Sequence, residues 1–390
     1  MQQQRILQLC ASLSVGGAER LILGLAQHLN RERFDVHVCG LSVLRGNALQ
    51  PAFEQIGVPV YVPGSERFYD VNTIRAVAKY VRAHHIDVIH THLTHADVVG
   101  RIVGMITRRP VVSTMHNEPR DYDQQRRDRS TLQRWTARHL ATYLIAVSPS
   151  IREMYIREWG IAPDKIKTIR NAVPMDEYLA LPAEPQRAAH DGMVVTNIGR
   201  LNPQKAQHLL IDAARIVLQQ RPGTRFMIVG QGRLEQELKS HAEALGIADR
   251  VQFTGVRHDI PAILADTDIF VLSSLWEGLP VTAVEAMATA RPVVLTDVGG
   301  NRDLVEHGTH GYIVPPGDVP ALAEHLLRLM NNDAQRQAMG RAAREQVRST
   351  FSMEMFVRQH EELYAMMCGQ PASADEAVTN ATKAAFDKGA

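Results

Sequence analysis

Two glutamates near the start of one helix are the residues of this 390-residue chain with the clearest chemical potential. The apolar run 268–274 is typical of a buried strand, and Pro280, a residue favoured in the first turn of a helix, follows a short loop. We therefore predict a helix over residues 281–290. Glu277 would lie on the loop beside its positive end, and Glu285 about one turn inside.

The beginning of this helix has the properties of an anion site. The backbone N–H groups from Gly278 through Leu279 to Thr282 lack helical acceptors, and the helix dipole attracts negative charge. Two carboxylates there fit a ligand that is part phosphate and part polyol, because carboxylates accept hydrogen bonds from sugar hydroxyls. The spacing fits equally well a capping Glu277 and a Glu285 on the solvated face of the helix.

Other candidates lie where predicted strands end. Gly16 and Gly17 lie at the turn between the first strand and the helix after it, and would let the backbone approach a ligand. They match neither the dinucleotide fingerprint nor the P-loop, and they also fit a plain tight turn. Arg200 and Lys205 flank a loop and could neutralise a diphosphate, or could be two surface cations. Gly230, in a Gly-Gln-Gly turn, indicates another place where the backbone can approach a neighbour closely.

His116 ends a strand at the expected ligand side, where a satisfied structural histidine is an equally ordinary explanation. Asp266-Thr267-Asp268 has the form of a metal-binding D-x-D pattern, but it precedes a strand, at the end away from the ligand edge. We interpret it as a cap or turn. No His, Asp or Glu cluster has metal-ligand spacing, so we expect neither a metal nor a cofactor.

Strands and helices alternate twice along the chain, which predicts an α/β protein with two Rossmann-like domains. The strands are continuous apolar runs, typical of parallel sheets covered on both faces, and such sheets bind ligands at the carboxyl ends of their strands. A Pro-rich break at 181–192 separates the halves, and we expect the ligand in a cleft between them. The predicted strands are residues 6–12, 36–41, 58–62, 88–91, 111–115 and 144–148, then 194–198, 226–229, 251–254, 269–272 and 293–296.

The predicted domains are 1–185 and 190–350, which the family resemblance described below implies to be the acceptor side and the donor side. A helix over 351–368 carries a full apolar stripe, and residues 371–390 form a polar tail that we expect to be disordered.

Composition favours a cytoplasmic protein. Hydrophobic residues make up 45% and charged residues 22%, no apolar run is long enough to span a membrane, and the N-terminus lacks the form of a signal peptide. Three cysteines without paired spacing exclude a disulfide framework, and Cys10 and Cys39 fall in strand-like runs as buried thiols.

Positive charge is concentrated in the first half. Residues 1–180 carry 23 Lys and Arg against 17 Asp and Glu, whereas the remaining residues carry 20 against 25. The stretch from Arg120 to His139 holds six arginines, and Arg127, Arg134 and Arg138 share one helical stripe beside Trp135. This pattern predicts contact with an anionic membrane, or an ordinary solvated helix face. Nucleic acid would need a stronger basic patch with interleaved aromatics.

Taken together, the motifs resemble the retaining glycosyltransferases of family 4, which have the GT-B architecture. The resemblance covers about residues 5–367. The motifs that carry it are Gly16-Gly17-Ala18-Glu19-Arg20, Gly199-Arg200 with Lys205, Gly230-Gln231-Gly232, Glu277 and Glu285 with seven residues between them, Val298-Gly299-Gly300, and the run 311–318.

The resemblance implies a role for each motif. Arg200 and Lys205 would bind the donor diphosphate, Glu285 the ribose and Glu277 the transferred sugar. Gly16 and Gly17 would approach the donor phosphates, and His116 would lie near the donor sugar. Gly230, Gly278 and Leu279 would complete the donor site. Asn171 matches a position where such enzymes carry Asn-Gly-Val, although Ala172 departs from that pattern. The last helix would cross back onto the first domain.

The function implied is transfer of a hexose or N-acetylhexosamine from a nucleotide sugar, most simply UDP-linked, to a glycan or lipid-linked acceptor in cell-surface polysaccharide, lipopolysaccharide or glycoconjugate synthesis. The protein would act in the cytoplasm or at the inner face of the membrane. A sugar-nucleotide epimerase of the same architecture and a non-catalytic nucleotide-sugar-binding subunit are the alternatives.

Overall fold

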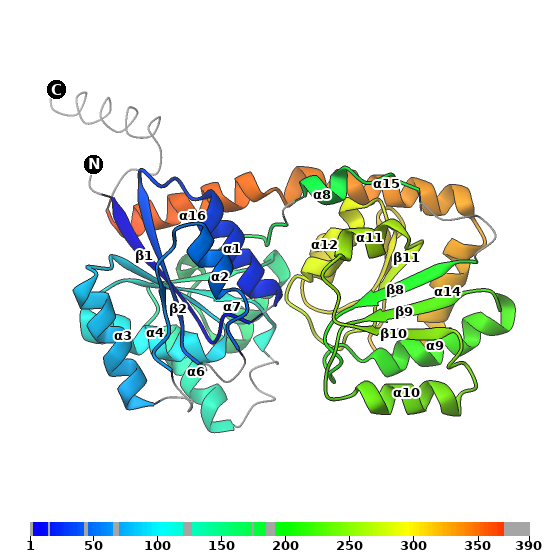
Figure 1. Cartoon of the computed structure of the whole chain (residues 1–390), viewed down its shortest axis with the longest axis horizontal. Helices are drawn as coiled ribbons and strands as arrows, with labels where there is room; N and C mark the ends of the chain where they lie inside the picture. The colour runs from blue at the N-terminus through cyan, green and yellow to red at the C-terminus, as the bar shows by residue number, and fades with distance from the viewer. Residues whose placement is uncertain are drawn as a thin grey trace, which may run out of the picture. The chain divides into compact units, whose positions relative to one another are not determined.

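A computed structural model of the chain describes residues 3–14, 16–42, 46–64, 70–119, 127–173, 175–184 and 192–369, with only the backbone given for 127–129. The described residues form two compact units (Figure 1). Unit 1 falls within Met1–Val147, Arg152–Asn171 and Met353–Ala390, and unit 2 within Ser148–Ile151 and Ala172–Ser352.

Unit 1 is built on a parallel sheet of seven strands in the order β3-β2-β1-β4-β5-β6-β7. The strands are β1 (Gln4–Cys10), β2 (Phe34–Gly40), β3 (Val60–Tyr61), β4 (Val88–His92), β5 (Val111–Met115), β6 (Tyr143–Ala146) and β7 (Ile166–Thr168). The helices that begin in or belong to this part of the chain are α1 (Gly17–His28), α2 (Gln50–Gln55), α3 (Val71–Ala83), α4 (Thr94–Thr107), α6 (Arg127–His139), α7 (Pro149–Trp159), the short 3-10 helix η1 (Pro163–Lys165) and α16 (Met353–Met367).

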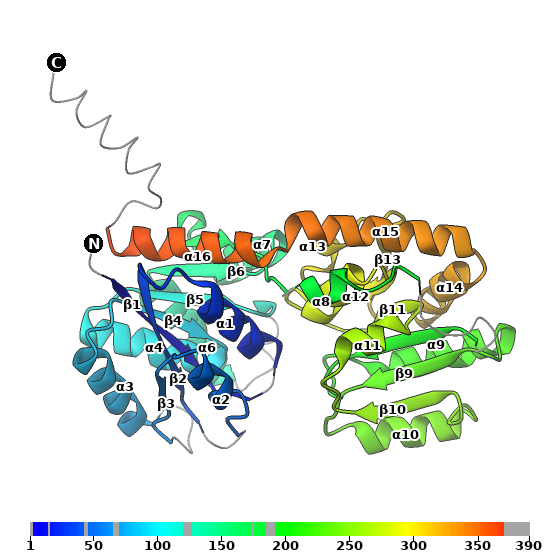
Figure 2. The same cartoon turned by 45° about the horizontal axis from the view of Figure 1, so that its top comes forward.

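The two faces of this sheet differ in what covers them. Leu7, Leu9 and Ile89 point to one face and form a hydrophobic core with residues of α3 and α4, and α6 packs beside α4. Successive strand residues alternate between faces, so Gln8 and His90 point the opposite way, toward α16, which packs on α1 (Figure 2). Helices therefore cover both faces, as parallel sheets require.

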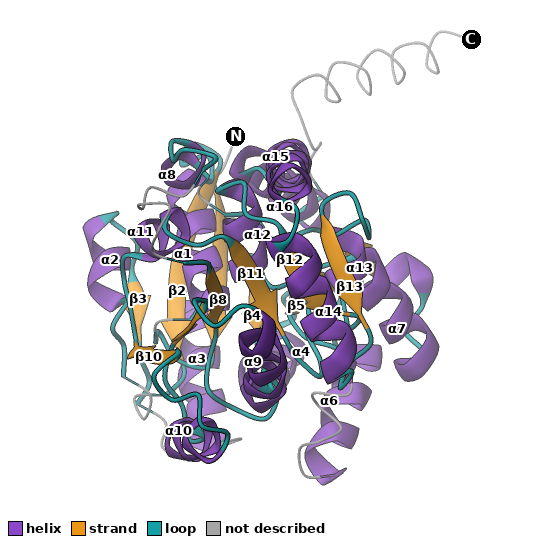
Figure 3. Ribbon diagram, turned by 90° about the vertical axis from the view of Figure 1, so that its right-hand side faces the viewer, coloured by secondary structure: helices purple, strands orange, loops and turns teal. Residues whose placement is uncertain are grey.

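Unit 2 holds a parallel sheet of six strands in the order β10-β9-β8-β11-β12-β13. The strands are β8 (Val194–Ile198), β9 (Arg225–Val229), β10 (Val251–Gly255), β11 (Ile269–Leu272), β12 (Val293–Thr296) and β13 (Gly311–Val314). The helices are α8 (Asp176–Leu179), α9 (Gln207–Gln220), α10 (Glu235–Ala244), α11 (Ile260–Ala265), α12 (Val281–Ala288), α13 (Asn301–Leu304), α14 (Val319–Met330) and α15 (Asp333–Thr350). Helix α9 packs with α10 and α14, and α12 packs with α8 and α15; Figure 3 shows the strands flanked by these helices.

The predicted fold class is confirmed, since both units have parallel sheets and α16 returns to unit 1. Two strands were missed, β7 and β13. Only one residue of β7, Ile166, is apolar, and β13 begins with Gly311 and is followed by two prolines, which favour a loop. The predicted helix at 281–290 ends earlier, at Ala288, and Pro280 is its N-cap instead of a first-turn residue. Among the described residues, no helix has both the length and the apolarity to span a membrane.

The unit boundary differs from the predicted one at 185, because residues 172–184 belong to unit 2. In this segment Tyr178 donates a hydrogen bond to Glu285, and Arg344 donates to the carbonyls of Leu179 and Leu181. Most of the predicted break, and the tail at 371–390, lie outside the described residues.

Candidate active site

Lys205 and Glu277 form the central contact of unit 2. The Lys205 Nζ atom lies 2.5 Å from Glu277 Oε1, and the Ser274 hydroxyl donates to the same oxygen at 2.6 Å. The two charged side chains are 15% and 5% exposed, so water screens their attraction only weakly. An ammonium group has three N–H donors, and one is engaged here, which leaves Lys205 able to hold Glu277 and a phosphate oxygen together.

Two loops are tied together to place this pair. The Ser273 hydroxyl donates to the carbonyls of Lys205 and Ala206, and the Gln204 amide donates to the carbonyl of Trp276. Ala206, at the N-cap of α9, has φ +44°, a left-handed conformation that costs free energy for a residue with a side chain. The contacts from Ser273 hold it there, so the loop before α9 is fixed against the loop before α12.

Gly230 and Gly232 serve this arrangement by letting two loops pack closely. A Cβ atom on Gly230 would lie 2.1 Å from the Gly199 carbonyl oxygen, and one on Gly232 would lie 2.2 Å from that of Leu201. Leu201 N–H also donates to the Gln231 carbonyl at 3.0 Å. The close approach anticipated from the sequence is thus to the backbone around Arg200, whose exposed side chain has no ion-pair partner among the described residues.

Glu285 is buried on α12 and accepts a hydrogen bond from Tyr178 at 3.0 Å. The alternative that Glu285 lies on a solvated helix face is therefore wrong. The Glu277 carboxylate is bound through Oε1 to Lys205 and Ser274. Both glutamates instead face protein partners at the start of the same helix.

The loop after β12 closes on the start of α12. Gly300 N–H donates to the Gly278 carbonyl at 2.6 Å, and a Cβ atom on Gly300 would lie 2.6 Å from that oxygen. Leu279, in the loop that precedes α12, is 4% exposed, and its burial holds that loop in place. Gly300 is thus needed for packing against the residues that precede the helix.

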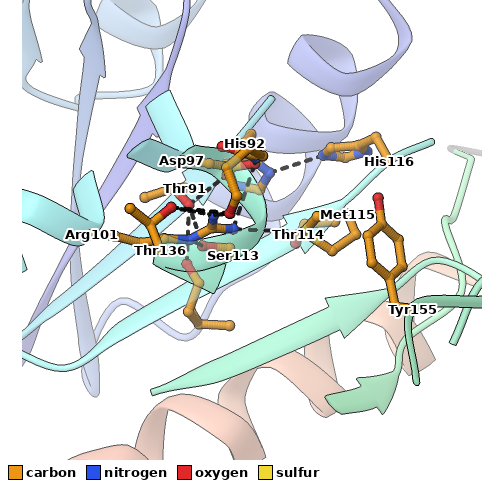
Figure 4. A network of polar contacts seen from close by, with 12 residues as sticks. Thr91, His92, Asp97, Arg101, Ser113, Thr114, Met115, His116, Thr136 and Tyr155 are labelled. Atoms are coloured by element: carbon orange, nitrogen blue, oxygen red, sulfur yellow. Dashed lines mark hydrogen bonds and ion pairs between the residues drawn. The ribbon is translucent and has the colours of Figure 1, made fainter. Parts of the chain in front are cut away.

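Three predicted site residues, Gly16, Gly17 and His116, belong to unit 1. Gly16 is the N-cap of α1, and a Cβ atom on it would lie 2.3 Å from the Glu19 carboxylate, so the close neighbour here is an acidic side chain of the same helix. Gly17 is the first residue of α1 and is exposed. His116 follows β5, is partly exposed, and its Nε2 lies 3.1 Å from His92 Nδ1 (Figure 4).

A second polar network lies on the opposite face of β4 and β5. Asp97 and Arg101 of α4 are fully buried and 3.7 Å apart. Asp97 accepts from Thr91 and from Gln133, while Arg101 donates to Ser113 (Figure 4). Burial raises the pKa of Asp97, and the Arg101 charge opposes that shift. The network connects α4 with β4, β5 and α6.

Sequence reasoning missed several partners of the site. Ser274 was assigned only to a strand, and neither Tyr178 nor His92 was singled out. Each is joined to a predicted site residue by a hydrogen bond that crosses a gap of three to 107 positions. A short serine-glutamate spacing could have indicated Ser274, but no local pattern indicates Tyr178.

The D-x-D pattern is a strand cap, as interpreted. The Asp268 carboxylate accepts from Val194 N–H at 2.7 Å, and Thr267 is hydrogen-bonded to Thr196. In the described part of the chain, no group of three His, Cys, Asp or Glu residues could hold a metal ion. Cys10 and Cys39 are buried free thiols, as predicted.

Comparison with known proteins shows two family matches along the chain. Residues 15–177 match the family described as Glycosyltransferase Family 4, and residues 183–346 match Glycosyl transferases group 1. An Escherichia coli relative, UDP-Gal:alpha-D-GlcNAc-diphosphoundecaprenol alpha-1,3-galactosyltransferase, is 28% identical over 90% of this chain and 94% of its own length. The phosphatidyl-myo-inositol mannosyltransferase of Mycobacterium leprae is 28% identical over 85% of this chain and 88% of its own.

Solved structures agree with these matches. The Anabaena protein HepE in complex with UDP and glucose has a TM-score of 0.82 and 26% identity, covering 93% of this chain and all of that one. The same protein with UDP-glucose has a TM-score of 0.81. With its two parallel-sheet units and both family matches, this chain belongs to the glycosyltransferases of family 4 and has the GT-B fold.

Proposed function

We propose that the enzyme is a retaining glycosyltransferase that moves a hexose or N-acetylhexosamine from a UDP-sugar to a glycan or lipid-linked acceptor in the synthesis of cell-surface polysaccharide, lipopolysaccharide or glycoconjugate. The E. coli relative is named for a UDP-galactose donor and a diphosphoundecaprenol acceptor, and the HepE structures hold UDP, glucose or UDP-glucose. These names support the donor base and the acceptor class.

The observation that carries the proposal is the Lys205–Glu277 pair at the start of α12. A diphosphate needs positive charge and N–H donors, whereas a sugar needs hydroxyl acceptors. This one place offers the ammonium group of Lys205, the helix N-terminus and the Glu277 carboxylate. Arg200, on the loop packed against Gly230, adds a second cation.

In the proposed reaction the bond between the sugar C1 and the phosphate oxygen breaks, and its electron pair stays on the phosphate. The acceptor hydroxyl oxygen bonds to C1 from the same face, and its proton passes to the leaving phosphate. The products are the glycoside and UDP. Arg200, Lys205 and the N-terminus of α12 stabilise the charge that develops on the leaving group.

Arg200 and Lys205 supply this charge stabilisation in the proposal, and no metal ion is used. We therefore expect turnover to be unchanged by a chelator such as EDTA. Restoration of lost activity by Mg²⁺ or Mn²⁺ would contradict this part of the proposal.

Removing either cation tests the assignment. Arg200→Ala and Lys205→Ala should each lower kcat by about 100-fold, the usual effect of losing one charge-stabilising donor. Arg215→Ala, which removes an exposed arginine of α9, is the matched control and should be unaffected. Unchanged turnover in Arg200→Ala would refute its role.

The assay itself separates the candidate functions. UDP-, GDP- and ADP-sugars are first screened for thermal stabilisation, since a ligand bound to the folded state raises apparent stability. UDP release that depends on an acceptor distinguishes transfer from epimerisation and from binding alone. The anomeric configuration of the product, read by NMR, then tests retention, and an inverted product would overturn the same-face step.

We also propose that the enzyme works in the cytoplasm at the inner face of the membrane, with α6 in contact with anionic lipid. Arg134, Trp135 and Arg138 are exposed, and Trp135 is 51% exposed with its ring beside His139. The buried side of α6 packs on α4 instead. The side chain of Arg127, and residues 120–126, lie outside the described part of the chain.

Vesicle binding tests this contact. Replacing Arg134 and Arg138 by serine should weaken binding to vesicles that contain anionic lipid, about 30-fold if each of the two cations contributes roughly 1 kcal/mol near the surface. Arg75 and Lys79 are exposed on α3 at the same spacing, so their replacement by serine is the matched control. Equal binding by both double variants would contradict the proposal.

A further inference from the structure

A chain of buried polar side chains runs under α16 to His116. Gln8, His90 and Thr114 lie on neighbouring strands β1, β4 and β5 and point to the face that α16 covers. The alternation of side chains puts His92 on this same face, two residues after His90. Tyr364 of α16 is fully buried against them.

The hydrogen bonds of this chain are continuous. Starting at Tyr364, the hydroxyl receives a hydrogen bond from Gln8 Nε2 at 2.9 Å, and Gln8 Oε1 lies 2.8 Å from His92 Nε2. His92 Nδ1 then lies 3.1 Å from His116 Nε2. On its other side the Tyr364 hydroxyl lies 2.6 Å from His90 Nδ1, and His90 Nε2 lies 2.7 Å from Thr114 Oγ1.

The orientation of the Gln8 amide fixes which ring nitrogens carry protons. Gln8 Oε1 can only accept, so His92 must donate from Nε2 and is left with a lone pair on Nδ1. His116 must then donate from Nε2 to that lone pair, so its own Nδ1 is an acceptor. Gln8 Nε2 donates to the Tyr364 oxygen, which leaves the tyrosine proton free for a hydrogen bond to His90 Nδ1.

We propose that Tyr364 is a positioning residue, which through Gln8 and His92 holds His116 as the neutral Nε2–H tautomer with its Nδ1 lone pair directed to a hydroxyl of the sugar substrate. This inference rests on the proposed function. Nδ1 has no hydrogen-bond partner among the described residues, and the His116 side chain is partly exposed, so a ligand can reach it. A neutral acceptor nitrogen selects a hydroxyl and disfavours a phosphate, which itself only accepts.

The electrostatic surroundings agree with neutral rings. Burial, together with the nearby His360, lowers the pKa of His116 to about 4. Burial also lowers the pKa of His92 and of His90 well below the ordinary value. At neutral pH these histidines therefore act through tautomers and not through charge.

The wild-type enzyme gives the first test. Nitrogen NMR distinguishes protonated from unprotonated ring nitrogens, and His116→Gln identifies the signals of residue 116 by their disappearance. We expect His116 to carry its proton on Nε2. A proton on Nδ1, which follows if the Gln8 amide is turned over and every bond in the chain reverses, would overturn the inference.

Tyr364→Phe gives the second test, because it removes the hydroxyl that accepts the hydrogen bond from Gln8 Nε2 and leaves the ring in place. His92 and His116 should then populate both tautomers, and the KM for the donor sugar should rise about tenfold with a smaller change in kcat, as expected for one lost hydrogen bond. The effect should vanish with the deoxy donor that lacks the hydroxyl bound by His116. Donor KM unaffected by Tyr364→Phe, or raised equally for every deoxy donor, would contradict the proposal.

Tyr80→Phe is the matched control. The Tyr80 hydroxyl is also hydrogen-bonded to a histidine of unit 1, His37 at 2.8 Å, but it has no place in the chain to His116. It should leave the His116 signals and the donor KM unchanged. If no UDP-sugar binds, the proposed function fails, while the tautomer measurement still decides whether α16 sets the state of His116.

Discussion

At the residue scale, Gly230 combines an unusual backbone conformation with a close contact. Its φ is +130°, and an added Cβ would lie 2.1 Å from the backbone of Gly199. Gly230→Ala should therefore destabilise the protein by more than about 2 kcal/mol, because strain and overlap add, and should weaken UDP-sugar binding by moving the Arg200 loop. Urea unfolding and ligand titration measure the two effects.

Gly246 provides the control for this substitution. It has φ +70° but open space around its Cβ position, so Gly246→Ala should cost only about 1 kcal/mol and leave ligand binding intact. Equal losses in the two variants would show that the contact with Gly199 has no consequence.

The predictability of single residues depended on whether their neighbours are near in sequence. Lys205 and Glu277 could be singled out because a strand end and a helix start are local patterns. Their pairing with each other, 72 positions apart, could not be read, and neither could the bond from Tyr178 to Glu285. Both depend on which loops the sheet order brings together.

At the scale of elements, the buried pair Asp97–Arg101 holds α4 between the sheet and α6. Arg101→Met leaves a buried carboxylate without its charge partner and should cost about 3–5 kcal/mol of unfolding free energy. Arg109→Met removes an exposed ion pair with Asp87 at the same distance, 3.7 Å, and should cost less than about 1 kcal/mol. Urea unfolding of both variants measures the difference, and similar midpoints would contradict a structural role for the network.

Strands were predictable where the sequence contains a continuous run of apolar residues. The strands β5, β8, β11 and β12 match their predicted ranges, whereas β7 and β13 are outer strands in which polar residues or a glycine interrupt the apolar run. The segment at 172–184 was placed in the wrong unit because composition marks a break but does not show on which side a short helix packs.

At the scale of the molecule, histidines whose pKa the fold lowers make stability depend on pH. Burial lowers the pKa of His116 and of His360 to about 4, while both titrate near 6.5 in the unfolded chain. The unfolded state thus binds more protons between these values, so the free energy of unfolding falls as pH falls from about 6.5 to about 4. The loss is about 1 kcal/mol per pH unit for each such histidine.

Urea midpoints at pH 7.5 and pH 5 measure this loss. We expect a marked drop in the wild type and a smaller one in His360→Gln, which removes one of the titrating groups. His139→Gln, at an exposed site on α6, should behave as the wild type. A pH dependence unchanged by His360→Gln would show that the buried ring does not contribute.

The return of α16 to unit 1 has a consequence for the order of events on the ribosome. Nearly all of unit 2, residues 172–352, is synthesised before Met353. Gln8 of β1, in contrast, gains its hydrogen-bond partner Tyr364 only after 356 further residues have been added. Domains generally fold as units during synthesis, so the later half of the chain can mature first. Until α16 is added, Gln8 and His90 lack their hydrogen-bond partner Tyr364, and the face of the sheet that α16 covers stays open to water.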